Sequence, residues 1–297
     1  MHFINAKGIL TGSGGHLGMN IYRGCSHGCI YCDSRSSCYQ FSHPFEDIEV
    51  KQNACELLEM ALRSKRKKAM IGTGSMSDPY MHCEEKLRLT RQCLKIILKY
   101  GFGAAILTKS DRILQDIDLL DEINKSAKCV VQMTLTTYND DLCGIVEPNV
   151  CRTKRRIEVL SQMRERNIPT VVWLSPILPF INDTEENLRA ILDECIRVGV
   201  RGIICFGMGL TLRDGDRQYY YAALDKYFPG MKQKYMQYYD NAYELLSPNA
   251  NKLMSVFYKV CTENGILCLP EECFAYLQEF PEKHKQMSLF DNEEIIN

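Results

Sequence analysis

The sequence has no long hydrophobic run, no excess of charge of either sign and no recognisable export signal. No stretch approaches the roughly 18 consecutive apolar residues of a membrane-spanning helix, so we expect no membrane contact. Lysine and arginine number 36 against 37 aspartates and glutamates, for a net charge of −1. Any nucleic-acid binding must therefore come from local basic patches rather than from a global charge. The first residues, Met1–Lys7, lack the apolar core of a signal peptide, which predicts a cytoplasmic protein.

The chain is rich in cysteine, with 15 in 297 residues. An odd number without an export signal argues against a disulfide framework. In a reducing compartment, thiols serve as metal ligands or as small buried hydrophobes. Cys93 and Cys195 lie in amphipathic helical patterns, and Cys129 and Cys205 lie in apolar strand-like runs. These four are expected to be packing residues, because free cysteine is among the most buried residue types.

Short apolar runs alternate with longer amphipathic patterns over about two thirds of the chain. The six candidate strands are Met19–Tyr22, Ala69–Thr73, Ala104–Thr108, Cys129–Leu135, Thr170–Leu174 and Gly202–Phe206. Helical spacing occurs between them at Glu46–Arg63, Glu84–Tyr100, Arg112–Asn124, Thr153–Arg166 and Thr184–Val198. This alternation predicts an α/β fold, a partial or full parallel (β/α) barrel of about six strands. Functional residues are then expected where the strands end.

The chain changes character after about Leu210, where tyrosines crowd a lysine-containing helical stretch. We predict three parts. Residues 1–210 form the barrel, residues 211–283 form a C-terminal helical cap, and residues 284–297 form a flexible tail.

Three cysteines after the first candidate strand have the spacing C-x3-C-x2-C: Cys25, Cys29 and Cys32. Three neighbouring thiolates can hold an iron–sulfur cluster and leave one iron with an open coordination position, which marks a catalytic metal centre. The alternative is a structural zinc site completed by His27, Cys38 or His43. Zinc typically takes paired C-x2-C units, and no second pair follows.

This loop resembles the signature of the radical S-adenosylmethionine (radical SAM) superfamily, in which an aromatic residue, here Tyr31, precedes the third cysteine. The resemblance implies a 4Fe–4S cluster on Cys25, Cys29 and Cys32, with S-adenosylmethionine chelating the open iron. It also implies an external electron donor, whose electron cleaves S-adenosylmethionine to a 5′-deoxyadenosyl radical that abstracts hydrogen from a substrate.

The loop after the second strand, Gly72–Tyr80, is similar to the family segment that binds the amino group of S-adenosylmethionine. Glycines such as Gly74 permit close backbone approach to a ligand, and Ser77 and Asp78 offer polar groups. The competing interpretation is a simple turn that ends in Asp-Pro.

Two further strand ends offer polar groups to the cofactor. Thr134 and Thr136, at the end of the fourth strand, can meet a ribose, although threonine is also a good strand former. Arg156 can pair with the cofactor carboxylate in a charge-assisted bond. The alternative for Arg156 is a solvated basic start of a helix.

Several segments together resemble the spore photoproduct lyase-like branch of the superfamily: Asn20–Cys25, Ser77–Tyr80, Glu147–Pro148 with Arg155–Arg156, and Pro176–Asp183. The founding member repairs a thymine crosslink in DNA. Its hydrogen-returning cysteine aligns with Ser75, whose O–H bond is too strong for that step, so a different reaction is expected. Cys38, Cys83 or Cys143 are the candidate substitutes.

The tail contains Gln286–Phe290, Gln-Met-Ser-Leu-Phe, which closely resembles the peptide by which bacterial DNA-polymerase and repair proteins bind the replication sliding clamp. With the basic runs Arg63–Lys68 and Lys154–Arg156, it favours an enzyme that acts on DNA, in repair or base modification. One alternative is the same chemistry on a peptide or small molecule. The other is a non-catalytic iron–sulfur electron-transfer or clamp-binding protein.

Overall fold

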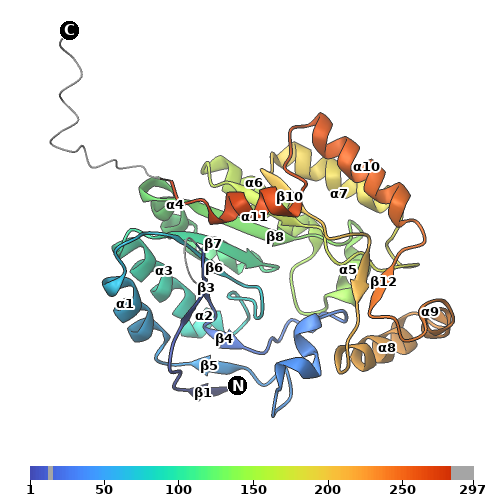
Figure 1. Ribbon diagram of the computed structural model, residues 1–297, viewed down its shortest axis with the longest axis horizontal. Helices are drawn as coiled ribbons and strands as arrows, with labels where there is room; N and C mark the ends of the chain where they lie inside the picture. The colour runs from blue at the N-terminus through green and yellow to red at the C-terminus, as the bar shows by residue number, and fades with distance from the viewer. Residues whose placement is uncertain (13–15, 282–297) are drawn as a thin grey trace, which may run out of the picture.

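A seven-stranded sheet forms the centre of the computed structural model, which describes residues 1–12 and 16–281 (Figure 1). Its strand order is β10-β9-β8-β7-β6-β3-β2. The strands are β2 (Leu10–Thr11), β3 (His16–Met19), β6 (Met70–Thr73), β7 (Gly103–Thr108), β8 (Cys129–Thr134), β9 (Thr170–Trp173) and β10 (Gly202–Ile204). The six strands from β3 to β10 are parallel, and β2 pairs antiparallel with β3.

The expected α/β fold of about six parallel strands is confirmed, and the sheet is curved and open. In the described part of the chain, β10 pairs with β9 and makes one further bridge, from Gly202 to Leu267. At the other edge, β3 pairs with the short strand β2. Of the two forms predicted, the structure is therefore the partial barrel.

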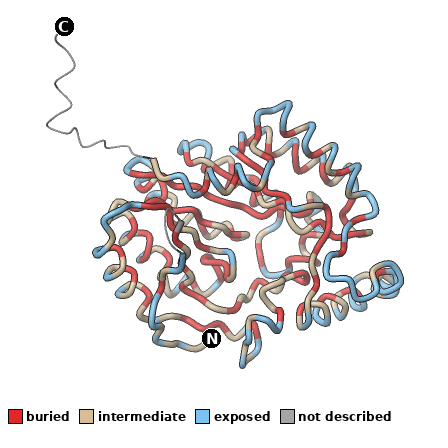
Figure 2. The backbone as a smooth tube through the Cα atoms, in the orientation of Figure 1, coloured by how far each residue is buried: buried red, intermediate tan, exposed pale blue. Residues whose placement is uncertain are grey.

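Helices cover the convex face of this sheet. The 3-10 turns are η1 (Asp33–Arg35), η2 (Ser37–Tyr39) and η3 (Asp111–Asp116), and α5 (Asp140–Val146) packs in a separate core beside Cys29 and Tyr31. The helices on the convex face are α1 (Ala54–Ser64), α2 (Glu84–Leu87), α3 (Leu89–Lys99), α4 (Ile117–Ser126), α6 (Thr153–Glu165), α7 (Glu185–Val198) and α10 (Ala250–Glu263). Their apolar faces meet strand residues such as Ile71, Ile106 and Val131 in the main core. Figure 2 shows that the backbone is buried along the central strands and more exposed along the outer helices.

The concave face is closed at one end by α11 (Pro270–Gln278). Cys273 and Leu277 of this helix pack on Met70, Val130 and Val171 near the starts of the strands. The opposite end of the concave face, where the strands end, stays accessible to ligands.

Two small sheets flank the main one. β1 (His2–Ile4) pairs parallel with β5 (Glu49–Lys51), which pairs antiparallel with β4 (Tyr22–Arg23). β11 (Gly209–Thr211) pairs antiparallel with β12 (Glu244–Leu246), and α8 (Asp216–Tyr227) and α9 (Met231–Tyr239) lie in the chain between them. The predicted division at residue 210 falls within β11 and stays a prediction, as does the flexible tail, which lies outside the described residues.

Three expected elements differ in the structure. The first strand ends at Met19, and Tyr22 then joins the small sheet by pairing with Val50. The helix expected at Glu46–Arg63 begins only at Ala54, because β5 occupies its first part. The helix expected at Glu84–Tyr100 is interrupted at Arg88, whose φ of 51° is left-handed. None of the described helices is long and apolar enough to span a membrane.

Candidate active site

Cys25, Cys29 and Cys32 lie in the loop that leaves β4, and all three line a cavity of about 80 Å³ at the ends of β6 and β7. The Cys25 N–H donates to the Phe45 carbonyl over 3.1 Å. Gly24 has a φ of 84°, and a Cβ there would lie 2.5 Å from that same carbonyl oxygen. Glycine is therefore required for the chain to enter the cysteine loop in this way.

The segment after α5 supports the cysteine loop from the other side. Ile30 donates its N–H to the Val146 carbonyl over 3.0 Å, and Asn149 donates to the Ser26 and His27 carbonyls. The Tyr31 hydroxyl donates to the Glu147 carboxylate. Backbone and side-chain bonds thus hold the loop in one conformation before any cofactor binds.

The zinc alternative can be compared with the arrangement of the possible ligand atoms. Thiolates on one zinc lie about 3.8 Å apart, because Zn–S bonds are about 2.3 Å long. These three cysteines do not form a group with all ligand atoms within 4.8 Å of one another, whereas His43 forms such a group with His2 and Glu49. His43 thus belongs to another group of ligand atoms, and the zinc alternative through His43 is not supported.

The thiols carry their protons in the absence of a metal. Burial, with the nearby Asp78 charge, raises the pKa of Cys25 to about 12. Burial also raises the pKa of Cys29 and of Cys32. Since thiolates are the ligands of iron–sulfur clusters, cluster assembly must displace these protons.

Arg156, predicted to meet the cofactor carboxylate, lies outside this cavity. It is fully buried, and its Nη1 lies 2.6 Å from Glu147 Oε2. Its remaining donors reach the Cys151 and Thr134 carbonyls and the Cys143 sulfur. The guanidinium is fully engaged within the protein, so the structure gives no support to a contact with cofactor.

Lys109, which the sequence reasoning missed, is the cation that lines the cavity. Within the described residues its ammonium group makes no ion pair or hydrogen bond, and it lies 6.0 Å from the centre of the Tyr31 ring. Burial lowers its pKa, but electrostatic interactions with Cys29 and Glu147 outweigh burial, and the net pKa is raised. Lys109 directly follows β7, so the rule that sites gather at strand ends was the signal that could have found it.

The loop after β6 brings Gly74, Ser77 and Asp78 to the same cavity. The Ser77 hydroxyl is buried without a hydrogen-bond partner among the described residues, so it is available to a ligand. Asp78 is already bonded to the Tyr80 and Lys109 N–H groups and to the Thr108 hydroxyl. The close approach at Gly74 is to the Leu107 carbonyl, which a Cβ would meet at 1.9 Å.

The two threonines predicted to face the cofactor ribose are placed differently. Thr134 lines the cavity, at the end of β8. Thr136 lies beyond it, and its carbonyl accepts hydrogen bonds from the carboxamides of Asn182 and Asn187. Only Thr134 is positioned to contact a ligand beside the cysteines.

A second cavity of about 470 Å³ adjoins the first and shares Tyr31, Cys32, Lys109 and Thr134 with it. Ser75 and Met76, which follow β6, also line both cavities. The remaining walls come from η1, η2 and the ends of β9, β10, β11 and β12; they include Asp33, Tyr39, Trp173, Phe206, Glu244 and Leu246. Neither Cys38, Cys83 nor Cys143 lines either cavity. The structure therefore supplies no thiol other than the three of the cysteine loop to either cavity.

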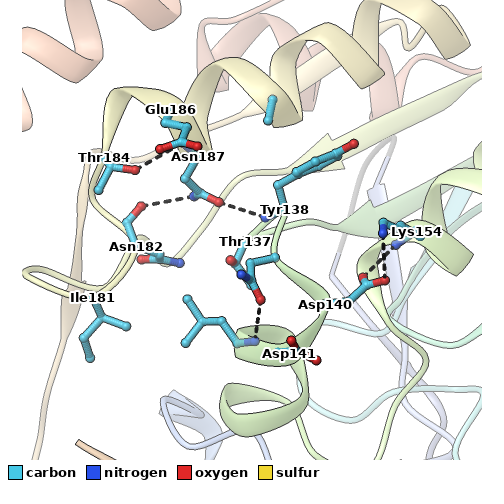
Figure 3. A pocket seen from close by; sticks show the side chains of 13 residues that line it. Thr137, Tyr138, Asp140, Asp141, Lys154, Ile181, Asn182, Thr184, Glu186 and Asn187 are labelled. Carbon is cyan, nitrogen blue, oxygen red and sulfur yellow. Dashed lines mark hydrogen bonds and ion pairs between the residues drawn. The ribbon is translucent and has the colours of Figure 1, made fainter.

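A larger cavity, about 790 Å³, lies between the starts of α5, α6 and α7 (Figure 3). Thr137, Asp140, Lys154 and Asn187 are among its lining residues, and no cysteine is. Asn187 accepts the Tyr138 N–H and donates to the Asn182 carbonyl, so its amide is committed to the loops that follow β8 and β9. This cavity has no lining residue in common with the two cavities beside the cysteine loop.

Several curated proteins are similar in sequence to this chain. An uncharacterized protein of Mycobacterium tuberculosis is 27% identical over 227 residues, which is 74% of this chain and 66% of the relative. The chain thus spans just under two thirds of the length of that relative. An uncharacterized protein of Methanocaldococcus jannaschii is 33% identical over 169 residues, 56% of this chain and 62% of the relative. A radical SAM Nalpha-GlyT isomerase of Pseudomonas phage M6 is 23% identical over 180 residues, 61% of this chain and 36% of the relative.

Solved structures of spore photoproduct lyase have a similar fold. The complex with dinucleoside spore photoproduct matches with a TM-score of 0.60 at 14% identity, covering 85% of this chain and 75% of the lyase. A variant with bound AdoMet and the same dinucleoside matches with a TM-score of 0.59 at 14% identity, covering 84% and 74%. A family model described as the radical SAM superfamily matches residues 19–195. Because this match extends over more than half of the chain, the protein belongs to the radical SAM superfamily.

Proposed function

We propose that this radical SAM enzyme binds a nucleobase of DNA in the 470 Å³ cavity and abstracts a hydrogen atom from it. The observation that carries the proposal is the continuity of that cavity with the cysteine loop, through Tyr31, Cys32, Lys109 and Thr134. The volume falls in the range of roughly 300–1,000 Å³ that is typical of small-molecule sites. A substrate there reaches the cofactor without further opening of the sheet.

The cofactors of the enzyme are a 4Fe–4S cluster and S-adenosylmethionine, and the residues present fit both. Cys25, Cys29 and Cys32 would hold the cluster, as their donor type and spacing allow. Lys109 would bind the carboxylate of S-adenosylmethionine, and the unpartnered Ser77 hydroxyl would accept from its ammonium group. When bound, the two cofactors together supply a 5′-deoxyadenosyl radical. The protein contributes the positions of these groups and excludes water with Tyr31 and Leu107, which line the inner cavity.

Aromatic side chains at the far wall of the cavity favour a planar substrate. Phe206 is 60% exposed, an unusual position for a phenylalanine beside a cavity. It contacts Trp173 at a ring-centre distance of 5.8 Å and stacks on Phe274 at 6.1 Å. Nucleobases stack on such rings with little dependence on sequence. A base rotated out of a strand could enter this cavity between Phe206 and the cysteine loop.

The test is anaerobic turnover by the reconstituted enzyme with dithionite and S-adenosylmethionine. Formation of 5′-deoxyadenosine is expected, and its absence from an intact, reduced cluster would contradict the proposed chemistry. Single-stranded DNA oligonucleotides are expected to raise the rate of 5′-deoxyadenosine formation and to become modified. Phe206→Ala is expected to remove this stimulation while it leaves the slow rate without DNA unchanged, because Phe206 does not line the inner cavity.

A peptide or another small molecule is the second candidate substrate. Asp33 and Glu244 line the outer cavity, and carboxylates there favour a substrate with a cationic group over a phosphate. Stimulation by a basic peptide and not by DNA would favour this candidate. The non-catalytic alternative has no support, because the chain belongs to a superfamily of enzymes.

The proposed association with the sliding clamp depends on Gln286–Phe290, which lies outside the described residues. A pull-down with the clamp, with and without this pentapeptide, tests it. Equal recovery of the shortened chain would show that the pentapeptide does not bind the clamp, and the clamp would then give no support to a DNA substrate.

A further inference from the structure

Three side chains of the types that bind transition metals meet on the small sheet beside the cysteine loop. His2 is in β1, Glu49 is in β5, and His43 is in the loop that precedes β5. One ligand atom from each lies within 4.8 Å of the others, and this is the one such group of three found in residues 1–12 and 16–281. Two imidazoles and one carboxylate are a common zinc ligand set, with water in the fourth position.

Both histidines have the hydrogen-bonding pattern of metal ligands. Histidines that bind a metal through one ring nitrogen usually donate the other ring N–H to a carboxylate or a backbone carbonyl. Here His2 Nδ1 lies 3.0 Å from Asp47 Oδ2, and His43 Nδ1 lies 2.9 Å from the Pro44 carbonyl oxygen. In His2 the nitrogen that remains for a metal is Nε2, and in His43 Nε2 faces Glu49 Oε1, the third group, at 2.7 Å. These ring hydrogen bonds are a second observation, separate from the proximity of the three ligand atoms.

The third group, Glu49, is already ionised and fixed. Arg23 Nη1 donates to Glu49 Oε1 over 3.1 Å, and His43 Nε2 lies 2.7 Å from the same oxygen. Two ligand atoms on one zinc lie about 3.3 Å apart, because Zn–N and Zn–O bonds are each about 2 Å long. A movement of about half an ångström at the His43 ring would therefore admit the ion between them.

The site is open to solvent on one side only. The His2 side chain is 41% exposed, whereas those of His43 and Glu49 are 15% and 11% exposed. An ion can enter past His2 and be held by two largely buried ligands. We propose that His2, His43 and Glu49 form a zinc site that joins the N-terminal strand to the loop in front of β5.

Such a site would support the cysteine loop from outside the cavity. Phe45, two residues after His43, accepts the Cys25 N–H. Arg23, two residues before Cys25, holds Glu49 and also donates to the Tyr39 and Gln40 carbonyls. Zinc on His2, His43 and Glu49 would restrain both points at which the cysteine loop is attached. Its role is structural and does not depend on the substrate of the enzyme.

The test uses the full chain with Cys25→Ala, Cys29→Ala and Cys32→Ala, so that the cysteine loop cannot take zinc. Calorimetric titration with ZnCl₂ is expected to show one bound ion. At a zinc concentration about a hundredfold above Kd, the Tm is expected to rise by roughly 5 °C. Adding His43→Ala is expected to abolish both effects. Adding His82→Ala, which replaces an exposed histidine outside the group, is expected to leave both intact.

Elemental analysis of the cluster-loaded native protein gives a second measurement, should the cysteine-free chain fold poorly. After equilibration with zinc and gel filtration, one zinc per chain is expected beside the iron. His43→Ala should lose the zinc. The absence of bound zinc in the native protein would overturn the proposal, as would zinc that persists in His43→Ala. Either result would leave His43 and Glu49 as a plain ion pair.

Discussion

Arg156 Nη1 lies 2.6 Å from Glu147 Oε2, and neither side chain is exposed to solvent. Glu147 also accepts from the hydroxyl of Tyr31, which sits between two of the cysteines. Arg156 in turn donates to the carbonyl of Thr134, the last residue of β8. One buried ion pair therefore connects the end of a central strand to the cysteine loop. The position of Tyr31 in that loop depends on this ion pair.

Replacing Glu147 with glutamine is expected to destabilise the protein by about 3 kcal/mol, because it leaves the Arg156 charge buried without a counter-ion. Urea unfolding at neutral pH measures this loss. The matched control is Glu158→Gln in the same part of the fold: Glu158 pairs with Arg155 but is 60% exposed. Exposed pairs contribute at most about 1 kcal/mol. Equal losses for the two variants would contradict the importance of the buried pair.

Acid is expected to weaken the same interaction. Burial raises the pKa of Glu147, but the charges of Arg156 and Lys109 and the Tyr31 hydrogen bond outweigh it, so the net pKa lies below the ordinary 4.5. A carboxyl whose pKa is lowered on folding contributes stability that is present above its unfolded pKa and is lost as the pH falls below it. The difference in unfolding free energy between the native chain and Glu147→Gln should therefore shrink below about pH 4.5. A difference that stays constant down to pH 3 would contradict this assignment.

Cluster binding should depend on Cys29 and not on Cys38. Cys29→Ala removes one of the three thiols that line the inner cavity, and iron content after anaerobic reconstitution is expected to fall to background. Cys38 is exposed and lines neither cavity, so Cys38→Ala should keep its full iron content and form 5′-deoxyadenosine normally. Iron retained by Cys29→Ala would refute the ligand assignment. Loss of activity in Cys38→Ala, with a normal iron content, would indicate that the Cys38 thiol takes part in the reaction.

Local patterns predicted much of this architecture. The strands β6 to β10 lie where short apolar runs alternate with helical patterns, and the three cysteines that their spacing singled out line one cavity. The expected helix at Glu46–Arg63 was wrong in its first part, because Glu49 and Val50 pair with both β1 and β4. That pairing depends on β1 and β4, which are distant in sequence.

Long-range contacts also explain the site residues that sequence reasoning placed less well. Arg156 has the sequence context of an exposed helix start, but Glu147 and Tyr31 approach it only in the folded chain. Its burial could not be read from the pattern of its own helix. Lys109 directly follows a strand, so the rule that sites gather at strand ends could have indicated it. It was not predicted, because a single lysine is not part of a recognisable motif.

Lys109 is expected to determine the affinity for S-adenosylmethionine. Its ammonium group faces the inner cavity and has no ion pair within the described ranges, so the cofactor carboxylate would be its counter-ion. A charge-assisted hydrogen bond is worth about 1.5–3 kcal/mol, so Lys109→Met should raise the Kd of S-adenosylmethionine by roughly 10- to 100-fold. Equilibrium dialysis with the reconstituted enzyme measures this change.

The matched control is Lys154→Met, because Lys154 is 68% exposed and lies at the start of α6, away from the cavity. It should bind S-adenosylmethionine like the native enzyme. The comparison requires that Lys109→Met keeps the iron content of the native chain and a Tm close to it. An unchanged Kd in Lys109→Met, with normal iron and Tm, would mean that the carboxylate is bound by another group.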